Sequence, residues 1–343
     1  MENRSQLPTV DVIIPTLNAA KALEPCLRSI RFQKYDQKKL RILIIDGGSI
    51  DETLNIAKNY QCLIFPNPLK TAEAAKAVGI KKSKSKYIAL IDSDNILPSP
   101  DWLSVMITPL ENDLKIVGSE PWEYTYRPNG GFIERYSALT GVNDPYALIA
   151  GNYDRINLLR PNWNGLNIPV INHRNYQSFT LKQGNRLPSI GANGTIYRKS
   201  FLHKYFHSDY LIDVDVITQA LSKTDNLSFA KVKCGIIHTY CESSIPKFIR
   251  KQNRRVTDLY IYQNIRPNQI VKSHLFGNIK FTLYVILIFP MLFDTIKGLI
   301  RKSDPAWSFH TLACVLTFYI YILVTIKYKL GILKPINRQQ WQQ

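Results

Sequence analysis

The sequence lacks the cysteine patterns that mark disulfide frameworks and thiolate metal sites. Its five cysteines are odd in number, widely scattered and never spaced as a CxxC pair. This usage favours a reducing compartment such as the cytosol. The first twelve residues, MENRSQLPTVDV, also lack the apolar stretch of a secretory signal peptide, so we expect no secretory leader.

Acidic residues are scarce as well. The chain has 26 Asp and Glu against 44 Lys and Arg, a formal net charge of +18 over 343 residues. Such an excess requires an anionic partner, either nucleic acid or the anionic face of a membrane. No zinc finger, basic zipper or RNP aromatic pattern is present, nor are the GxGxxG, P-loop and HExxH motifs. We therefore expect a membrane partner and no nucleic acid.

Strand-like and helix-like segments alternate along the first 117 residues. Apolar runs predict strands, and segments with apolar residues at helical spacing predict helices between them. Repeated βα units of this length predict an α/β fold with a mostly parallel, doubly wound sheet. The predicted strands are 10–15, 40–45, 62–65 and 87–91, and the predicted helices are 19–33, 51–60 and 71–82.

The rest of the chain changes character twice. Residues 119–187 are rich in Trp, Tyr, Asn, Pro and Gly, which is typical of binding loops carried by a rigid sheet. A basic run follows at 247–255, and most long apolar runs lie after residue 274. We expect a nucleotide-binding half at residues 1–118 and an acceptor-binding half with the catalytic base at 119–245. A basic linker at 246–274, membrane-associated helices at 275–330 and a tail at 331–343 would follow.

Two carboxylates follow the strand at 87–91. Asp92 and Asp94 lie in the sequence ALIDSDN, where an open α/β sheet places its ligand crevice. Carboxylates are hard ligands that hold Mg²⁺ or Mn²⁺ against substrate phosphates. The residue types Asp, Ser, Asp and Asn of this sequence are also common in ordinary turns. Polar residues at the ends of two other strands, in IIPTLN and IIDGGSIDET, favour a shared site.

Together with AAKAVGI, these motifs resemble the family 2 glycosyltransferases, which have a GT-A fold that is Rossmann-like. The resemblance covers about the first hundred residues. Gly47 replaces the second Asp of the family's usual DDGS, and Ala77 replaces the Asn of its usual ARN. The resemblance implies that Pro15, Thr16 and Asn18 line a base and ribose pocket and that Asp46 contacts the nucleobase. It also implies that Lys76 contacts the diphosphate, that Asp92 contacts the ribose or the metal, and that Asp94 is a metal ligand.

A second cluster comprises Gly191, Ala192 and Asn193. Glycine lets the backbone approach a ligand closely, although a simple tight turn has the same composition. The resemblance implies that this segment lines the acceptor side of the donor sugar. Asp213 and Asp215 stand where the family carries its catalytic base. They share a face if the segment is a strand and diverge if it starts a helix. We favour Asp215, with Asp213 close behind.

Three basic side chains complete the candidate site. The resemblance implies that His238 contacts the metal or the diphosphate, although a lone His is more often structural. Arg254 and Arg255, in QNRRV, resemble the QxxRW signature of processive synthases, with Val256 in place of Trp. That replacement favours single-sugar transfer. The basic run is equally compatible with a diphosphate contact and with anionic headgroups.

The apolar segments 281–293 and 309–326 favour membrane attachment, and their basic flanks favour helices with all basic ends on the cytoplasmic face. We predict an inverting transferase at the cell membrane. It would move a sugar from a nucleotide-sugar, a UDP-sugar in first place, with Mg²⁺ or Mn²⁺, to a lipid-linked acceptor (a polyprenyl-linked saccharide or polyprenyl phosphate) in glycan biosynthesis. The alternatives are a sugar-1-phosphate nucleotidyltransferase and a non-catalytic basic membrane-associated protein.

Overall fold

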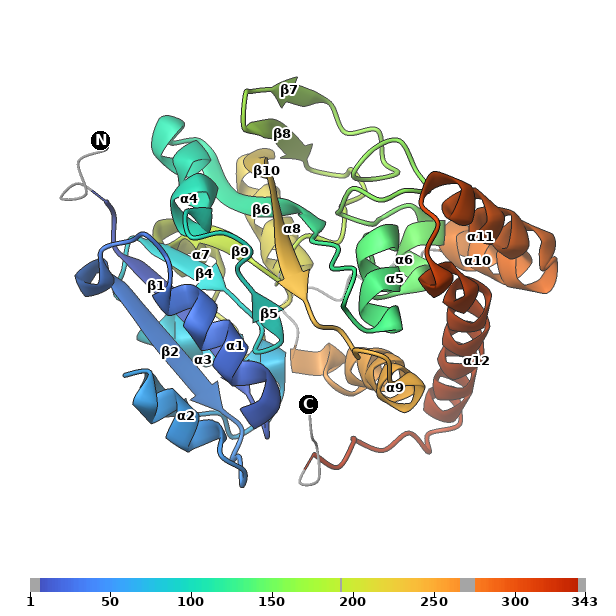
Figure 1. The fold of residues 1–343 in the computed structure, drawn as a ribbon, viewed down its shortest axis with the longest axis horizontal. Helices are drawn as coiled ribbons and strands as arrows, with labels where there is room; N and C mark the ends of the chain where they lie inside the picture. The colour runs from blue at the N-terminus through green and yellow to red at the C-terminus, as the bar shows by residue number, and fades with distance from the viewer. Residues whose placement is uncertain (1–6, 192, 266–274, 339–343) are drawn as a thin grey trace.

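The structure is a computed structural model that describes residues 7–191, 193–265 and 275–338. A ten-stranded sheet forms its centre, in the order β3-β2-β1-β4-β9-β6-β10-β8-β7, and β5 pairs with β10 (Figure 1). The strands are β1 Val10–Thr16, β2 Leu40–Asp46, β3 Leu63–Pro66, β4 Tyr87–Leu90, β5 Asn95–Ile96, β6 Ile116–Tyr124, β7 Val170–Asn172, β8 Tyr176–Lys182, β9 Thr195–Arg198 and β10 Asn226–His238.

Helices cover both faces of this sheet and extend it at one end (Figure 1). The helices are α1 Ala20–Arg31, α2 Thr53–Asn59, α3 Ala72–Lys82, α4 Trp102–Asn112, α5 Phe132–Thr140, α6 Pro145–Ala150, α7 Lys199–Tyr205, α8 Asp213–Thr224, α9 Ile245–Ile261, α10 Leu275–Ile286, α11 Phe289–Arg301 and α12 Phe309–Lys329. The four predicted strands and three predicted helices are all confirmed, with ends that shift by at most two residues.

The N-terminal part of the sheet is parallel, as predicted. β1 pairs in parallel with β2 and with β4, and β2 pairs in parallel with β3. Every residue of β1 is buried because helices pack on both faces of the sheet. The carboxyl ends of these strands therefore lie at one edge, which is where the sequence places its polar residues.

Beyond β4 the sheet is mixed, which the sequence did not predict. β9 runs antiparallel to both of its neighbours, β4 and β6. The reason is the route of the chain, which enters β9 from the edge where β4 ends. The expected border between residues 118 and 119 falls inside β6, so the two expected halves share one sheet. The five cysteines are free thiols.

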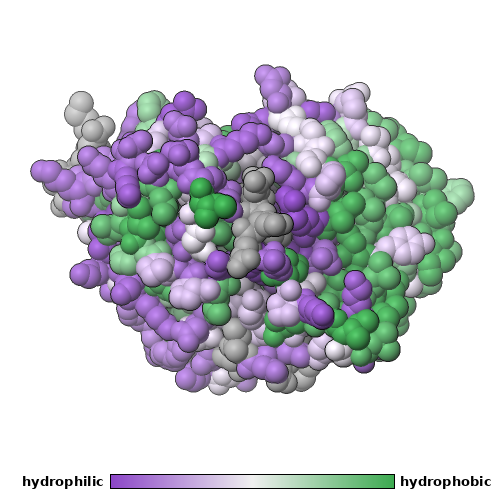
Figure 2. Space-filling view, turned by 90° about the horizontal axis from the view of Figure 1, so that it is seen from below, coloured by the Kyte–Doolittle hydropathy of each residue, from purple (hydrophilic) through white to green (hydrophobic). Residues whose placement is uncertain are grey.

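The three last helices form an apolar end of the molecule. α12 packs on α9, α6 and α5, and α10 and α11 meet at an angle of 82°. Figure 2 shows apolar surface concentrated over this end. Among the described residues, the stretch Pro305–Lys329 is long and apolar enough to cross a membrane, and the bent pair α10 and α11 passes the same test only when counted together.

Candidate active site

The ends of β1, β4 and β10 meet in a crevice of about 110 Å³. Seven of the fifteen predicted site residues line it, although they come from segments more than 200 residues apart. The lining residues are Pro15, Ala72, Asp92, Ser93, Asp94, Asn143, Asn193, His238, Tyr240, Lys251, Arg254 and Arg255.

Asp94 is held between two basic side chains. Its carboxylate lies 2.9 Å from the Lys251 ammonium and 3.3 Å from Nε2 of His238. Burial alone would raise the pKa of Asp94, but Lys251 and His238 hold that pKa well below its ordinary range. Asp94 is therefore a permanent anion in the crevice at neutral pH.

Asp92 is paired with Lys76 of α3. Their Oδ1 and Nζ atoms are 3.0 Å apart, and the Lys76 side chain is only 7% exposed. Burial would lower the pKa of Lys76, but Asp92 and Asp213 raise it above its ordinary value, so the side chain is cationic. Apart from this ammonium group, the buried Oδ1 of Asp92 has no hydrogen-bond partner among the described residues. This oxygen has coordination capacity to spare.

We tested whether these residues fit a divalent cation. Within the described part of the chain, no group of three or more His, Cys, Asp or Glu side chains is arranged to hold a metal ion. The expected ligand set of Asp92, Asp94 and His238 is therefore not a preformed cage. Mg²⁺ and Mn²⁺ sites of one or two carboxylates, completed by substrate phosphates and water, need no such cage. The spare oxygen of Asp92 and the ionised Asp94 fit that type.

Asp46, the predicted nucleobase contact, forms hydrogen bonds within the turn after β2. Its Oδ1 accepts hydrogen bonds from the hydroxyls of Thr16 (2.8 Å) and Ser49 (2.6 Å). Its Oδ2 accepts from the backbone N–H groups of Gly48 and Ser49, both at 2.8 Å. The four acceptor positions of the carboxylate are thus filled. Asp46 fixes the turn after β2, and a direct hydrogen bond to a nucleobase would require it to give up one of these contacts.

Asn18 likewise supports this turn. Its side-chain oxygen accepts from the Ile50 N–H at 2.9 Å, and its own N–H donates to the Ser49 hydroxyl at 2.8 Å. It adopts a positive φ of 49°, a conformation that Asn tolerates well. Pro15 and Thr16 instead line a small cavity next to the crevice. Of the three residues predicted to form the base and ribose pocket, Pro15 and Thr16 line this cavity, and Asn18 supports the turn after β2.

Buried charged side chains hold the segment that was predicted to line the acceptor side of the donor sugar. The Gly191 N–H donates to Oε1 of Glu120 at 2.9 Å, and Oε2 of Glu120 lies 2.8 Å from the Lys231 ammonium. Asn193 is held through its carbonyl by Arg155 at 3.3 Å. Hydrogen bonds to Glu120 and from Arg155 thus anchor the predicted segment at Gly191 and at Asn193. Ala192 lies outside the described residues.

The structure distinguishes the two candidate bases. Asp213 and Asp215 lie in the first turn of α8, where residues two apart point about 200° away from each other. Asp215 is buried, with 1% exposure. Asp213 is half-buried, accepts a hydrogen bond from the Tyr197 hydroxyl at 2.7 Å and lies against Gly191. Of these two residues, Asp213 is the one that borders the loop with Gly191, so the geometry favours Asp213 over Asp215 as the candidate base.

The pKa of Asp213 suits a proton acceptor. Burial raises this pKa to about 6, and the Lys76 charge and the Tyr197 hydrogen bond offset only part of the rise. A carboxylate with such a pKa is ionised at pH 7 and is more basic than an ordinary aspartate. Asp213 combines this basicity with a place beside the predicted acceptor segment.

Comparison with known proteins identifies the family. The model of Glycosyl transferase family 2 matches residues 11–206, more than half of the chain. The chain belongs to glycosyltransferase family 2. The matched region includes the crevice residues from β1, β4 and the loop before β9, but ends before α8 and α9.

Curated relatives match part of this family 2 glycosyltransferase. Glycosyltransferase AglE of Haloferax volcanii is 32% identical over 146 residues, which are 40% of this chain and 47% of AglE. Poly(ribitol-phosphate) beta-N-acetylglucosaminyltransferase TarP of Staphylococcus aureus is 35% identical over 94 residues, 26% of this chain and 29% of TarP. The matches thus span less than half the length of these relatives.

The fold is shared over a longer stretch. The mannosyltransferase PcManGT of Pyrobaculum calidifontis, solved with GDP-Man and Mn²⁺, matches with a TM-score of 0.53 and 13% identity. The match covers 96% of this chain and 89% of PcManGT. This likeness supports the α/β GT-A fold.

Five residues that line the crevice of this family 2 glycosyltransferase were not predicted as site residues: Ala72, Ser93, Asn143, Tyr240 and Lys251. Lys251 was noted only as part of a basic run, although helical spacing places it one turn before Arg254 and Arg255. Asn143 and Tyr240 carried no sequence signal. Arg255 donates to Oε1 of Gln252 at 2.8 Å and lies 3.6 Å from Asp144, so it is partly engaged within the protein.

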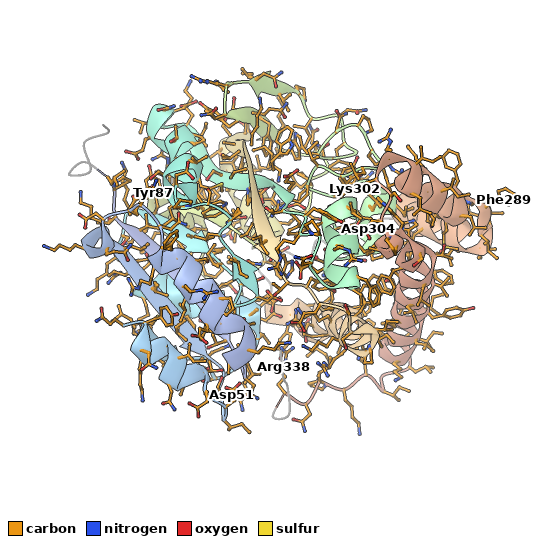
Figure 3. The ribbon with its side chains drawn as sticks, viewed as in Figure 1. Asp51, Tyr87, Phe289, Lys302, Asp304 and Arg338 are labelled. Atoms are coloured by element: carbon orange, nitrogen blue, oxygen red, sulfur yellow. The ribbon has the colours of Figure 1, made fainter. Side chains whose placement is uncertain are left out.

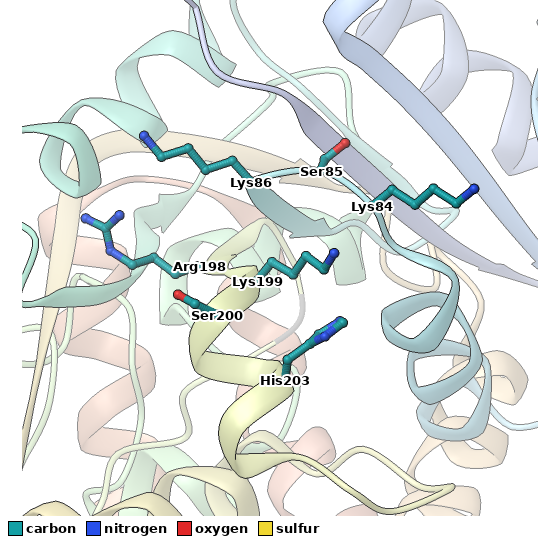
Figure 4. Close-up of a pocket in the computed structure, with 7 residues that line it drawn as sticks. All are labelled: Lys84, Ser85, Lys86, Arg198, Lys199, Ser200 and His203. Atoms are coloured by element: carbon teal, nitrogen blue, oxygen red, sulfur yellow. The ribbon is translucent and has the colours of Figure 1, made fainter.

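A separate basic pocket lies away from the crevice. It has a volume of about 440 Å³ and lies beside the start of β4 and α7, at the sheet edge opposite the predicted site residues (Figure 4). Arg198 there donates to backbone carbonyls, and Lys86 pairs with Glu111. The pocket contains none of the predicted site residues, and we assign it no catalytic role.

Proposed function

We propose that this protein transfers a sugar from a nucleotide-sugar, a UDP-sugar in first place, to a membrane-linked acceptor, with inversion at the anomeric carbon. The observation that carries this proposal is the position of Asp213, a half-buried carboxylate beside Gly191 and on the same side of the site as Lys76. The nucleotide-sugar and cation of the PcManGT complex support the same class of donor.

The crevice offers separate places for the leaving group and the acceptor. Lys76, Lys251 and Arg254 supply positive charge around the two aspartates, where the donor diphosphate would bind. A Mg²⁺ or Mn²⁺ ion held by Asp92 and Asp94 would neutralise the negative charge that develops on the departing diphosphate. Asp94 pairs with Lys251 in this structure, so the cation must compete with an ammonium group for that carboxylate.

Asp213 would take the proton from the attacking acceptor hydroxyl. Direct attack from the face opposite the leaving diphosphate inverts the anomeric configuration. Tyr197 orients the carboxylate through its 2.7 Å hydrogen bond. An acceptor such as a polyprenyl-linked saccharide presents such a hydroxyl. A polyprenyl-phosphate acceptor is already anionic and would depend less on Asp213, so the effect of this residue also reports on the acceptor class.

We propose that α10, α11 and α12 attach the protein to the cytoplasmic face of the cell membrane. Their outward side chains are large and apolar, with Phe289 at 82% and Ile300 at 80% exposure. The opposite side of α12 is buried against the catalytic part, including Phe309 and Ala313. A helix covered along one side by protein is suited to lie in the interface, and Lys327 and Lys329 at its end suit anionic headgroups.

Release of nucleoside diphosphate tests this proposal. The protein in detergent with a membrane lipid extract would be given a panel of nucleotide-sugars, with Mn²⁺ or with EDTA. We expect one donor to release its diphosphate only with the cation, and Asp94→Ala to abolish that release. Asp101→Ala, a change of an exposed aspartate at the start of α4, is the matched control. Release that is unchanged in Asp94→Ala or in EDTA would refute the assignment of this crevice.

A further inference from the structure

A cavity of about 380 Å³ lies beside the loop that precedes β7 and β8, and none of the described residues lines both it and the crevice. A cavity on the order of 150 Å³ accepts a benzene ring, so this one has room for one or two rings of that size. We call it the tryptophan cavity. Its aromatic and amide side chains come from β6, from the loop and from β8, and they are Trp122, Asn162, Trp163, Asn164, Asn167 and Gln177.

The lining of the tryptophan cavity is neutral. None of the described residues that line it is charged, although the chain has a formal net charge of +18. A nucleotide or a phosphate would find no opposite charge there to offset its loss of water. The cavity instead combines aromatic walls with a few amides, as pockets for neutral polar ligands do. Sugars match this combination, because a pyranose ring has hydroxyl groups around its edge and C–H groups on its faces.

Two tryptophans supply the aromatic walls. The Trp163 ring is 3% exposed and packs on Phe179, with ring centroids 4.7 Å apart, and the Lys231 ammonium lies 5.2 Å from its centroid. Trp122 is half-buried on β6. The electron-rich face of an aromatic ring attracts the polarised C–H groups of a sugar. Because its neighbours already fix Trp163, a ligand that stacks on it orders little further side chain.

Gln177 carries an unused hydrogen-bond acceptor in this cavity. Its amide nitrogen donates to Oδ1 of Asn172 at 2.8 Å, whereas its amide oxygen is buried and has no hydrogen-bond partner among the residues that the structure describes. A buried polar atom without a partner is costly, and a ligand hydroxyl that donates to it recovers that cost. Asn164 is held through its oxygen, which accepts from the Leu166 N–H at 2.8 Å, and its amide N–H groups are donors.

A short series of contacts connects the tryptophan cavity with the predicted acceptor segment. Lys231, which lies over the Trp163 ring, pairs with Oε2 of Glu120 at 2.8 Å. Oε1 of Glu120 accepts from the Gly191 N–H at 2.9 Å. Trp122 follows Glu120 by two positions along β6, so both side chains lie on one face of the sheet. The cavity is therefore on the acceptor side of the site.

The loop of the tryptophan cavity is also joined to the apolar end of the molecule. Arg160 pairs with Asp294 of α11 at 2.7 Å, and the Lys297 ammonium of the same helix donates to the Leu159 carbonyl at 2.9 Å. Phe289, the first residue of α11, lies at the outer tip of this end (Figure 3). The loop thus contacts both the helices that we propose to attach to the membrane and the buried charges that hold the acceptor segment.

We propose that the tryptophan cavity binds a sugar unit of the acceptor, remote from the hydroxyl that attacks the donor. Trp122 and Trp163 would stack on the faces of this sugar, and Gln177 would accept a hydrogen bond from one of its hydroxyls. The inference rests on the proposed function and narrows it. Of the two acceptor classes, it selects a lipid-linked saccharide, because polyprenyl phosphate has no sugar to place in the cavity.

Saturation-transfer NMR on the full chain tests the cavity without any transfer reaction. The probes are the neutral disaccharides chitobiose, cellobiose, maltose, lactose and mannobiose. We expect wild type to saturate the ring C–H protons of at least one of them. Trp122→Ala should weaken that binding about 10-fold or more, and Phe32→Ala, which removes an exposed aromatic ring elsewhere, should not change it. No saturation of any probe, or equal binding by wild type and Trp122→Ala, would overturn the proposal.

Gln177→Leu keeps the proposal testable where Trp122→Ala does not fold. It removes the buried acceptor at a similar side-chain size and should weaken binding of the same disaccharide. Gln183→Leu, at an exposed position after β8, is the matched control and should bind like wild type. Calorimetric titration with UDP and Mn²⁺ should give the same affinity for all four variants. Unchanged disaccharide binding by Gln177→Leu would refute the role of its amide oxygen.

Transfer to a membrane lipid extract connects the cavity with the reaction. Trp122→Ala should raise the KM for the lipid acceptor about 10-fold and leave the KM for the nucleotide-sugar unchanged. The disaccharide that binds should inhibit in competition with the lipid acceptor and not with the donor. An unchanged acceptor KM in Trp122→Ala, or transfer to polyprenyl phosphate alone at the rate seen with the extract, would show that the cavity does not hold the acceptor.

The failure of this inference can be told apart from the failure of the proposed function. If wild type transfers no sugar from any nucleotide-sugar, the proposed function fails, whatever the cavity binds. If wild type transfers sugar to lipid while Trp122→Ala and Gln177→Leu behave like their controls, the transferase stands and only the role of the tryptophan cavity is refuted.

Discussion

Replacing Asp213 with Asn separates a catalytic carboxylate from a structural one. The change keeps the size of the side chain and its contact with Gly191, but removes the proton acceptor. General base catalysis contributes about 10²- to 10⁴-fold to rate, so we expect kcat to fall by that factor for a hydroxyl acceptor. Binding of the nucleotide-sugar should change little, because Asp213 is assigned to the acceptor side.

The pH profile gives a second measure. Burial raises the pKa of Asp213 to about 6, so about one-tenth of the carboxylate is ionised at pH 5. With wild type, kcat/KM should rise about tenfold from pH 5 to its plateau above pH 7. The Tyr197 hydrogen bond lowers this pKa, and Tyr197→Phe should therefore move the inflection to higher pH.

Stability should change in the opposite direction from activity. The folded-state pKa of Asp213 lies above its ordinary value of 3.8, so this carboxylate lowers stability as pH rises from about 4 to 6. Asp213→Asn removes that penalty, and at pH 7 its melting temperature should equal or exceed that of wild type. A residue with a purely structural role would show a lower melting temperature instead.

The assay is diphosphate release at saturating donor from pH 5 to 8, with melting curves on the same samples. Asp215→Asn is the informative comparison, because Asp215 is buried and should lose stability rather than its rate per folded molecule. Full activity in Asp213→Asn with a hydroxyl acceptor, or a flat pH profile in wild type, would refute the assignment of the base.

Three further predictions follow from single contacts. Lys251→Met removes the ammonium group beside Asp94, so diphosphate release should saturate at a lower Mn²⁺ concentration; an equal or higher requirement contradicts the competition. Gly191→Ala should reduce activity at least tenfold, because φ is +131° and a Cβ atom would lie 2.1 Å from Cγ of Asp213; near-normal activity would place the acceptor elsewhere. Phe289→Glu should weaken binding to anionic vesicles in a flotation assay without changing the melting temperature, and undiminished binding would refute the membrane face.

The N-terminal half of the fold was predictable because its signals are local. Each predicted strand is an apolar run, and the polar residues that follow it must lie at one edge of a parallel sheet. Asp92 and Asp94 therefore meet Pro15 in the structure as the sequence implied. Lys76 could be placed in the same way, because α3 brings it to the same edge.

Other features depend on geometry that no local pattern records. The backbone turn after β2 decides that Asp46 is fully engaged, and the start of α8 decides which of Asp213 and Asp215 faces the site. The antiparallel course of β9 has a similar origin, since short apolar runs do not reveal strand direction. In these cases sequence reasoning identified the right segment but not the orientation within it.

Two long-range contacts near the crevice were beyond sequence reasoning. Arg338 reaches the carbonyl of Lys70 across 268 positions, and Lys251 reaches Asp94 across 157. Neither residue is marked by its neighbours, because Lys251 lies within a basic run and Arg338 lies beside Asn337 in a segment without a recognisable motif. The position of α9, which packs on α12, brings Lys251 to Asp94 and provides Asp258 as the partner of Arg338.

Transfer of labelled sugar into lipid tests the central claim most directly. The protein would be incubated with Mn²⁺, a membrane lipid extract and a panel of sugar-labelled nucleotide-sugars, and the label recovered in organic solvent would be counted. We predict that one donor labels the lipid fraction, that EDTA abolishes the labelling, and that Asp94→Ala does the same. If the label stays water-soluble for every donor while Asp94→Ala and wild type behave alike, the account of this crevice as a sugar-transfer site is contradicted.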